Sequence, residues 1–261
     1  MLRLTLIVAL KGRITRDSNT QGIVVASDTQ VTSYIKQPMQ KVFQLGNLPI
    51  LVGGSGSVSL SRHTVFCLKK VFLGFREKLR KEAGCEDFDV VVNSSIKSCL
   101  REIVKSHSDI IEQSGFSLIL GFSDATDVRL YEVQTDGVPM RMDDNPGYCC
   151  VGSGYSTGGS LLIQQFYSGD LTLYQLTMLA SYIISQVSSV DPNVGSIAEI
   201  RFGFGGKVIK PKGKIVQERL ELRSETMKKV WNLLESEDLE FERKFNKAFE
   251  KDKFRKVITS I

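Results

Sequence analysis

The feature that most constrains the fold of this chain is an alternation of short apolar segments with two pairs of longer amphipathic ones. The short segments contain few charged residues and are bounded by glycine or polar residues, which predicts β-strands. They occur as a group of four, a group of three and a closing pair. The expected strands lie at residues 5–10, 22–27, 41–45, 49–52, 116–121, 128–133, a segment ending at 151, 197–204 and 207–209.

The groups of strands are separated by two pairs of predicted helices. Apolar residues recur at helical spacing over residues 59–81 and 87–108, and two further helices are expected near residues 158–167 and 172–187. The glycine-rich segment at residues 53–57 is expected to end a strand and open the first helix. Strands, two helices, strands, two helices and strands in this order favour an α+β arrangement of two packed sheets covered by helices.

From Pro211 onward the composition changes, because charge increases and no glycine follows Gly213. We therefore expect a main domain over residues 1–210 and a charged helical appendage over residues 211–261. The appendage reads as two helices broken near residues 236–238. Two interpretations stay open: the helices pack on the main domain, or they form an arm that contacts a partner or another copy of the chain.

Charge and hydropathy exclude several classes of protein. The chain has 261 residues with 34 Lys and Arg against 29 Asp and Glu, a net charge of +5. This excess is small and no long basic run with interleaved aromatic residues occurs, so nucleic-acid binding is not expected. No apolar run approaches the roughly 20 residues that span a bilayer. The apolar segment near the N-terminus lacks the small-residue cleavage site of a signal peptide. We expect a soluble cytoplasmic protein that does not bind membranes.

The supply of cysteine and histidine argues against a metal centre. The five cysteines include no C-x-x-C pair, and the only histidines are His63 and His107. Neither a zinc site nor a disulfide framework is supported by this pattern, and no metal or organic cofactor is expected. A Ser-His-Asp triad would have to use one of only two histidines.

Four small features together supply the parts of a nucleophilic site without histidine. Thr5 heads the first expected strand, Asp28 ends the second, Lys41 starts the third and Gly53 ends the fourth. Each alone has an ordinary structural explanation. A threonine hydroxyl needs an adjacent base, and the α-amine of an N-terminal threonine, whose pKa is ordinarily about 8, can supply it. A lysine would stabilise the hydroxyl anion, a carboxylate would hold the lysine, and a glycine N–H could bind an oxyanion.

At these residues the chain resembles the proteasome β-subunit-like family of N-terminal nucleophile (Ntn) hydrolases, as a divergent archaeal or bacterial relative. The resemblance covers about residues 5–205 and implies a four-layer αββα sandwich of two packed antiparallel sheets. It implies Thr5 as the nucleophile, Asp28 and Lys41 as catalytic partners and Gly53 as the oxyanion glycine. It further implies a substrate contact at Thr32, a second hydroxyl at Ser153 in Gly152-Ser-Gly154, and a supporting carboxylate at Asp191.

The chain departs from the family pattern at several places. Leu4 precedes the threonine where the family usually has glycine, and Val194 stands where it usually has serine. The polar segment at residues 13–21 is longer than expected, and the segment from Asp28 to Lys41 is shorter. The resemblance also implies a polypeptide substrate and assembly into rings with copies of itself or other proteasome-like subunits. It is compatible with an ATPase partner.

Three functions follow from the resemblance. The first is a threonine-type peptidase or amidase that works through an acyl-enzyme after removal of residues 1–4, because with these residues attached the Thr5 nitrogen is an amide. The second is a peptide ligase, in which an amine replaces water on the acyl-enzyme. The third is a non-catalytic ring or scaffold subunit, which Leu4 and Val194 favour. Retention of Met1 would remove the support for the first, and covalent labelling of Thr5 would exclude the third.

Overall fold

The computed structural model describes residues 5–31, 37–38, 40–82, 87–106, 116–124, 127–134, 137–195 and 198–210. These residues all belong to the first of the chain's two units, Met1–Leu220. The predicted appendage at residues 211–261 lies outside the described residues, so it stays a prediction, as does the domain boundary before it.

The first sheet contains five antiparallel strands in the order β10-β1-β2-β11-β12. A hairpin of the first two strands forms its centre, with Ile7 opposite Ser27 and Arg13 opposite Gln21. β11 pairs along the other edge of β2, which places the C-terminal part of the described fold beside its beginning. The strands are β1 (Ile7–Arg13), β2 (Gln21–Asp28), β10 (Tyr148–Val151), β11 (Ala198–Phe204) and β12 (Lys207–Ile209).

The second sheet is also antiparallel and five-stranded, and its strands follow one another along the chain. Its members are β5 (Val42–Gln44), β6 (Ile50–Gly56), β7 (Phe116–Ser123), β8 (Val128–Val133) and β9 (Pro139–Arg141). A separate two-stranded pairing joins β3 (Gln30–Val31) and β4 (Gln37–Pro38). The consecutive order of the strands in this second five-stranded sheet explains why short apolar segments predicted it well. Each strand needs only its neighbour in the sequence as a partner.

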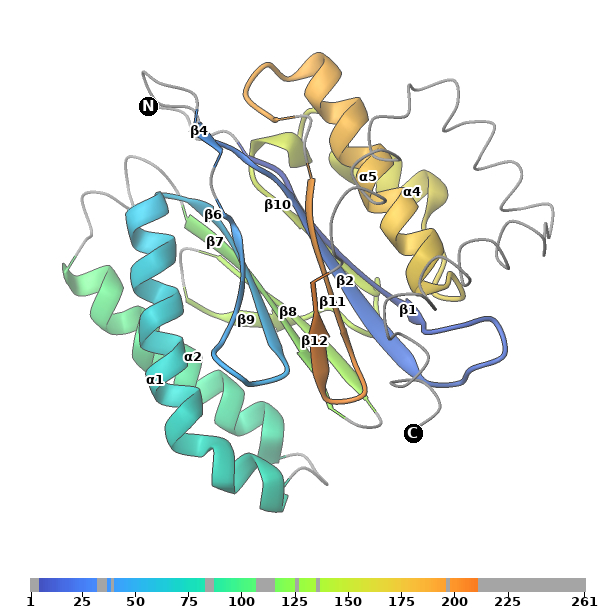
Figure 1. Ribbon diagram of the computed structural model, residues 1–261. Helices are drawn as coiled ribbons and strands as arrows, with labels where there is room; N and C mark the ends of the chain where they lie inside the picture. The colour runs from blue at the N-terminus through green and yellow to red at the C-terminus, as the bar shows by residue number, and fades with distance from the viewer. Residues whose placement is uncertain are drawn as a thin grey trace. The chain divides into compact units, whose positions relative to one another are not determined.

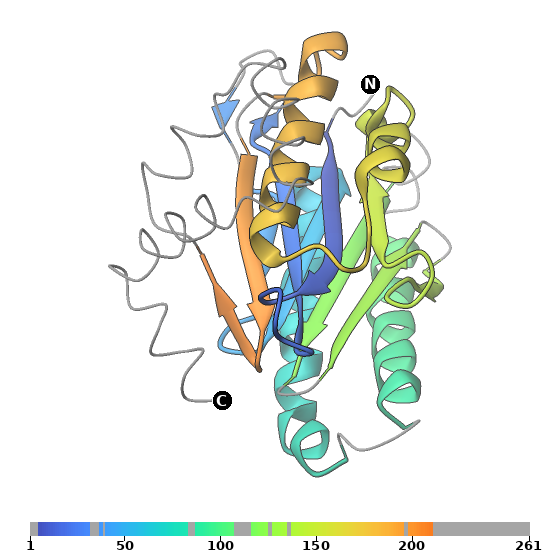
Figure 2. The same cartoon turned by 90° about the vertical axis from the view of Figure 1, so that its right-hand side faces the viewer.

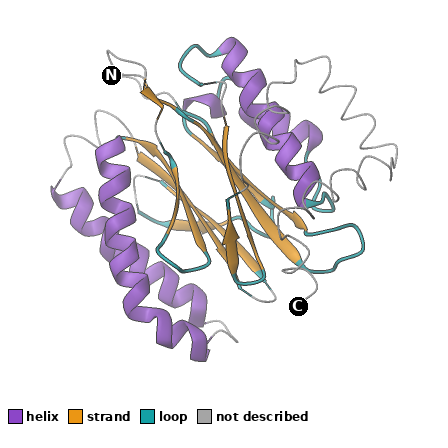
Figure 3. Cartoon of the chain, viewed as in Figure 1, coloured by secondary structure: helices purple, strands orange, loops and turns teal. Residues whose placement is uncertain are grey.

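Helices cover the outer faces of the two packed sheets (Figure 1). The helices α1 (Val58–Glu82) and α2 (Asp87–Ser106) lie on the second sheet, and α4 (Gly159–Phe166) and α5 (Leu173–Val190) lie on the first. The colouring by secondary structure in Figure 3 shows the same order of helices, sheet, sheet and helices, and Figure 2 turns the side with α4 and α5 toward the viewer. The expected four-layer α+β sandwich is confirmed. Among the described residues, none of the helices is long and apolar enough to cross a membrane.

Two apolar clusters explain why the central strands read as nearly continuous hydrophobic runs. One cluster lies between the sheets and includes Ile7, Ala9, Val25 and Ile119. The other joins the second sheet to α1 and α2. Leu6, Val8 and Leu10 alternate with the inter-sheet residues of β1 and are also fully buried. A strand covered on both faces must be apolar on both, so period-two alternation disappears from its sequence.

The structure differs from the sequence-based expectation at the glycine-rich segment. β6 continues through Gly56, and α1 begins at Val58, so residues 53–56 belong to the strand instead of ending it. Close packing explains this use of glycine, because a Cβ on Gly53 would lie 2.8 Å from Ile7 Cγ2 of the opposite sheet. The very short strands β3, β4 and β9 were not predicted either.

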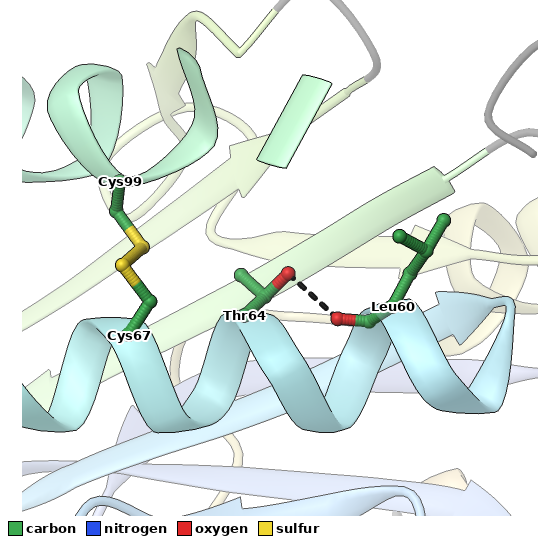
Figure 4. The surroundings of a disulfide bond; sticks show 4 residues. All are labelled: Leu60, Thr64, Cys67 and Cys99. Atoms are coloured by element: carbon green, nitrogen blue, oxygen red, sulfur yellow. Dashed lines mark hydrogen bonds between the residues drawn. A yellow bond between two sulfur atoms is a disulfide. The ribbon is translucent and has the colours of Figure 1, made fainter. Parts of the chain in front are cut away.

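A disulfide between Cys67 of α1 and Cys99 of α2 was also not predicted (Figure 4). Their Cα atoms lie 6.0 Å apart, although 32 positions separate them in the sequence. Cys149 and Cys150 are free and buried in β10. Sequence spacing alone does not reveal which surfaces of two helices face each other, which is why the cysteine count gave no hint of this bond.

Candidate active site

Thr5 lies just before β1 and is held on two sides by backbone contacts. It is buried, with 4 % of its surface exposed. Its carbonyl oxygen accepts a hydrogen bond from the Gly154 N–H at 3.3 Å, and the carbonyl oxygen of the next residue, Leu6, accepts one from the Asp28 N–H at 3.1 Å. The position of Thr5 is therefore fixed by the end of β2 and by the turn after β10.

Asp28, the last residue of β2, is the centre of the site. Its side chain is fully buried and accepts hydrogen bonds from four described groups. Oδ1 accepts from the Thr5 hydroxyl at 2.6 Å and from the Leu6 N–H at 2.8 Å. Oδ2 accepts from Lys41 Nζ at 2.7 Å and from the Gly195 N–H at 3.1 Å. A buried carboxylate is tolerated only when its charge is compensated in this way.

Lys41 comes directly before β5, and its ammonium group lies in the interior with Asp28. Only 7 % of its surface is exposed. Burial lowers the pKa of Lys41 below its usual 10.5, and the charge and hydrogen bond of Asp28 oppose this shift in part. The net direction brings the amine closer to neutrality at working pH than an exposed lysine would be. A lysine in this state can exchange a proton with its neighbours.

The turn Gly152-Ser-Gly154 packs directly against Thr5. Gly152 has φ of 102°, and a Cβ there would lie 2.2 Å from the Thr5 carbonyl oxygen. Only glycine fits both the backbone angle and the close approach. Ser153 starts the short 3₁₀ helix η1 (Ser153–Tyr155), and its hydroxyl oxygen is buried with no hydrogen-bond partner among the described residues. A buried hydroxyl without a partner is costly, so its presence in the turn that packs against Thr5 marks a candidate functional group.

Asp191 lies at the end of α5 and holds two loops together. Its carboxylate accepts from the N–H and the side-chain amide of Asn193, each at 3.0 Å, and from the Thr157 hydroxyl at 3.3 Å. The Val194 N–H donates to the Asp191 carbonyl oxygen at 3.0 Å. The next residue, Gly195, donates to Asp28. Asp191 thus shapes the loop that supplies a donor to the central carboxylate, and these hydrogen bonds connect it to the loops and not to Thr5.

The predicted residues are therefore brought together to different degrees. Thr5, Asp28 and Lys41 form one continuous hydrogen-bonded array. Gly53 lies opposite Val42, the residue after Lys41, and its role as an oxyanion donor stays a prediction. Thr32 lies outside the described residues.

Sequence reasoning missed two backbone groups of the site. The Gly195 N–H reaches Asp28 although Val194 replaces the expected serine beside it. The Leu6 N–H also donates to Asp28, in addition to the side chain of its neighbour Thr5. Backbone donors leave no signature in residue type, but Gly195, in the loop that follows α5, was a usable signal.

The arrangement brings together the groups that can activate a hydroxyl. A hydroxyl, a carboxylate and an amine of lowered pKa are joined by consecutive hydrogen bonds in a site shielded from water. In such surroundings, electrostatic interactions are stronger than in solution. A threonine is a weak nucleophile unless a neighbouring group accepts its proton, and this site provides such neighbours.

Comparison with known proteins gives one finding. The model of the proteasome subunit family matches residues 18–202, more than half of the chain. The match contains Asp28, Lys41 and Ser153 and begins after Thr5. A search of curated proteins found no match. Two packed antiparallel sheets between helix layers agree with the matched family. This chain belongs to the proteasome subunit family.

Proposed function

We propose that the protein is a threonine-type peptidase or amidase with Thr5 as its nucleophile. Family membership makes it a proteasome-like subunit, which implies assembly with other proteasome-like subunits. The observation that carries the catalytic proposal is the buried array of the Thr5 hydroxyl, Asp28 and Lys41, with distances of 2.6 and 2.7 Å. If this buried site had only a structural role, apolar side chains of similar size would fill it at a lower cost in stability.

In the proposed reaction, residues 1–4 are first removed, which frees the Thr5 amine. The Thr5 oxygen then attacks a peptide carbonyl, and the amine accepts the hydroxyl proton. Asp28 orients Lys41, whose positive charge stabilises the developing oxygen anion. The leaving amine takes the proton, and water then hydrolyses the ester to release the acyl group and restore the hydroxyl. Gly53 N–H would bind the oxyanion, and Ser153 would help to move protons.

The test uses three forms of the full chain: wild type, T5S and T5A. T5S keeps a hydroxyl and T5A removes it, and both changes leave Asp28 and Lys41 in place. We expect the mass of purified wild type and of T5S to lack residues 1–4, and a peptide electrophile to label residue 5 in both. T5A should keep its first four residues and remain unlabelled. Folding of T5A is checked by its thermal unfolding.

Two results would contradict the proposal. A wild-type chain that always retains Met1 and is never labelled at Thr5 would indicate a non-catalytic subunit. Equal hydrolysis of a peptide amide by wild type and T5A would place the nucleophile elsewhere. Adding an amine acceptor to the same assay separates hydrolysis from peptide ligation, because ligation yields a product that contains both amine and acyl group.

A further inference from the structure

Helix α1 exposes one side on which apolar and basic side chains are combined. Five of its exposed residues recur at helical spacing, so they lie on the same side of the helix. Phe66 and Leu73 are 58 % and 43 % exposed, and Lys70 Nζ lies 4.5 Å from the centre of the Phe66 ring. We call this side of the helix the α1 face; it consists of Arg62, Phe66, Lys69, Lys70 and Leu73.

No acidic residue of α1 lies among these cations. The sequence from Val58 to Gly74, which contains the whole α1 face, has no Asp or Glu. The exposed surface of α2 is different, because Arg101 and Glu102 carry opposite charges there. Cations around exposed apolar groups favour a partner that carries carboxylates around apolar side chains. They disfavour a symmetric contact between two α1 faces, since such a contact would bring like charges together.

A segment of the same chain has the complementary composition. Residues 231–242, which we call the acidic segment, contain five carboxylates and no Lys or Arg, and they are the densest acidic stretch of the sequence. The acidic segment lies outside the described residues, but its charge and its apolar residues match the α1 face. Its carboxylates are Glu235, Glu237, Asp238, Glu240 and Glu242, and its apolar residues are Trp231, Leu233, Leu234, Leu239 and Phe241.

We propose that the acidic segment of one copy of the chain docks on the α1 face of another copy. Its carboxylates pair with the three cations, and its apolar side chains cover Phe66 and Leu73. The two surfaces differ, so each copy uses its acidic segment on one neighbour and its α1 face for the other. Repeated contacts of this heterologous kind close into a ring when the rotation allows it. Such assembly agrees with family membership, and the inference does not depend on the chemistry of Thr5.

The structure fixes the α1 face in place for such a contact. Leu68 and Phe72, on the other side of α1, are fully buried against the second sheet and α2. Cys67, next to Phe66, is joined to Cys99 of α2. A helix held in this way loses little conformational freedom when a partner binds, so less entropy opposes the association.

The experiment reverses charges on each side of the proposed contact in the full chain. The face-reversed chain carries K69E/K70E, and the segment-reversed chain carries E237K/D238K. A third chain combines both pairs of changes. Sedimentation velocity over a range of concentrations gives the dissociation constant for self-association, and thermal unfolding checks that each chain is folded. If the face-reversed chain does not fold, K69Q/K70Q takes its place, because it removes the two charges without reversing them.

We expect the face-reversed and the segment-reversed chain each to associate about tenfold more weakly than wild type, because two attractions become repulsions. The combined chain should recover most of the lost affinity, since opposite charges face each other again. The control is K97E/R101E, which reverses two exposed cations of α2 and changes the net charge as K69E/K70E does. It should change the dissociation constant by about twofold at most. An equal loss in this control, or no recovery in the combined chain, would overturn the inference.

A mixture of the two singly reversed chains tests whether the contact joins different copies. Each of these chains repels its own kind, because its acidic segment position and its α1 face carry the same charge. The mixture brings opposite charges together, so we expect it to form assemblies that neither chain forms alone. A wild-type chain that stays monomeric at high concentration would overturn the inference. Reversals that lower thermal stability but leave association unchanged would also overturn it, since they would indicate that the acidic segment binds within its own chain.

Discussion

At the scale of single residues, the site depends on burying opposite charges side by side. Asp28 is fully buried and Lys41 nearly so, and neither would be stable there alone. The shift in the pKa of Lys41 shows which effect dominates: burial lowers it, and the attraction to Asp28 restores only part. The pair thus costs stability, as buried pairs of charges commonly do.

This balance predicts how stability depends on pH. The pKa of Lys41 is lower in the folded chain than the ordinary 10.5 of the unfolded chain. Between those two pKa values the unfolded chain binds more protons, so the contribution of Lys41 makes the folded state more stable as pH rises through that window. We expect the free energy of unfolding of wild type to increase relative to that of K41M as pH is raised toward 10.5.

The measurement is denaturant unfolding of both proteins at several pH values from neutral to about 10, just below the ordinary pKa of lysine. T5S is the control, because it is expected to lose residues 1–4 as wild type does and keeps both Lys41 and Asp28, so it should follow wild type. A difference between wild type and K41M that stays constant with pH, or that shifts in favour of K41M, would show that burial does not dominate the titration of Lys41.

At the scale of elements, the turn after β10 decides where Thr5 lies, and two glycines in it allow a matched comparison. Gly152 and Gly158 both have positive φ, 102° and 129°. A Cβ on Gly152 would collide with the Thr5 carbonyl oxygen, whereas nothing lies within 4 Å of a Cβ on Gly158. G158A should lose about 1–3 kcal/mol from backbone strain alone. G152A should lose roughly 1–3 kcal/mol more, because overpacking adds to the strain.

The two variants are compared by denaturant unfolding and by labelling of Thr5. G158A is expected to be labelled like wild type, since it leaves the contact to Thr5 unchanged. G152A should be less stable and poorly labelled. If the two variants are equally stable, the close approach of Gly152 to Thr5 does not constrain the fold.

The order of elements could be read from the sequence because local pattern determined it. Asp28 and Lys41 were found because each lies at the boundary of an apolar segment, and β2 does end at Asp28. The continuation of β6 through Gly56 was missed because glycine has low strand propensity, and only the tight packing of the opposite sheet favours it there. The contacts of Asp191 with Thr157 and of Gly195 with Asp28 depend on how distant loops meet, which no local pattern encodes.

At the scale of the whole molecule, family membership implies assembly, and the outer helix layer offers apolar groups to it. Phe66 and Leu73 lie seven positions apart on α1 and are 58 % and 43 % exposed. Residues at this spacing lie on the same side of a helix. Lys70 lies 4.5 Å from the centre of the Phe66 ring, so this side of α1 is both apolar and basic. Association that covers these side chains would remove apolar surface from water.

We therefore expect the purified chain to self-associate and F66E to weaken that association. Replacing a large exposed apolar side chain by a carboxylate removes the gain from burial and adds a charge that is costly to desolvate. The masses of the assemblies are measured by size-exclusion chromatography with light scattering over a range of concentrations. L161E, at an apolar position on α4 that is 69 % exposed, introduces the same charge outside α1 and should dissociate the assembly less. A wild-type chain that stays monomeric at high concentration would show that assembly needs other subunits, and an F66E chain that associates like wild type would show that this side of α1 faces solvent in the assembly.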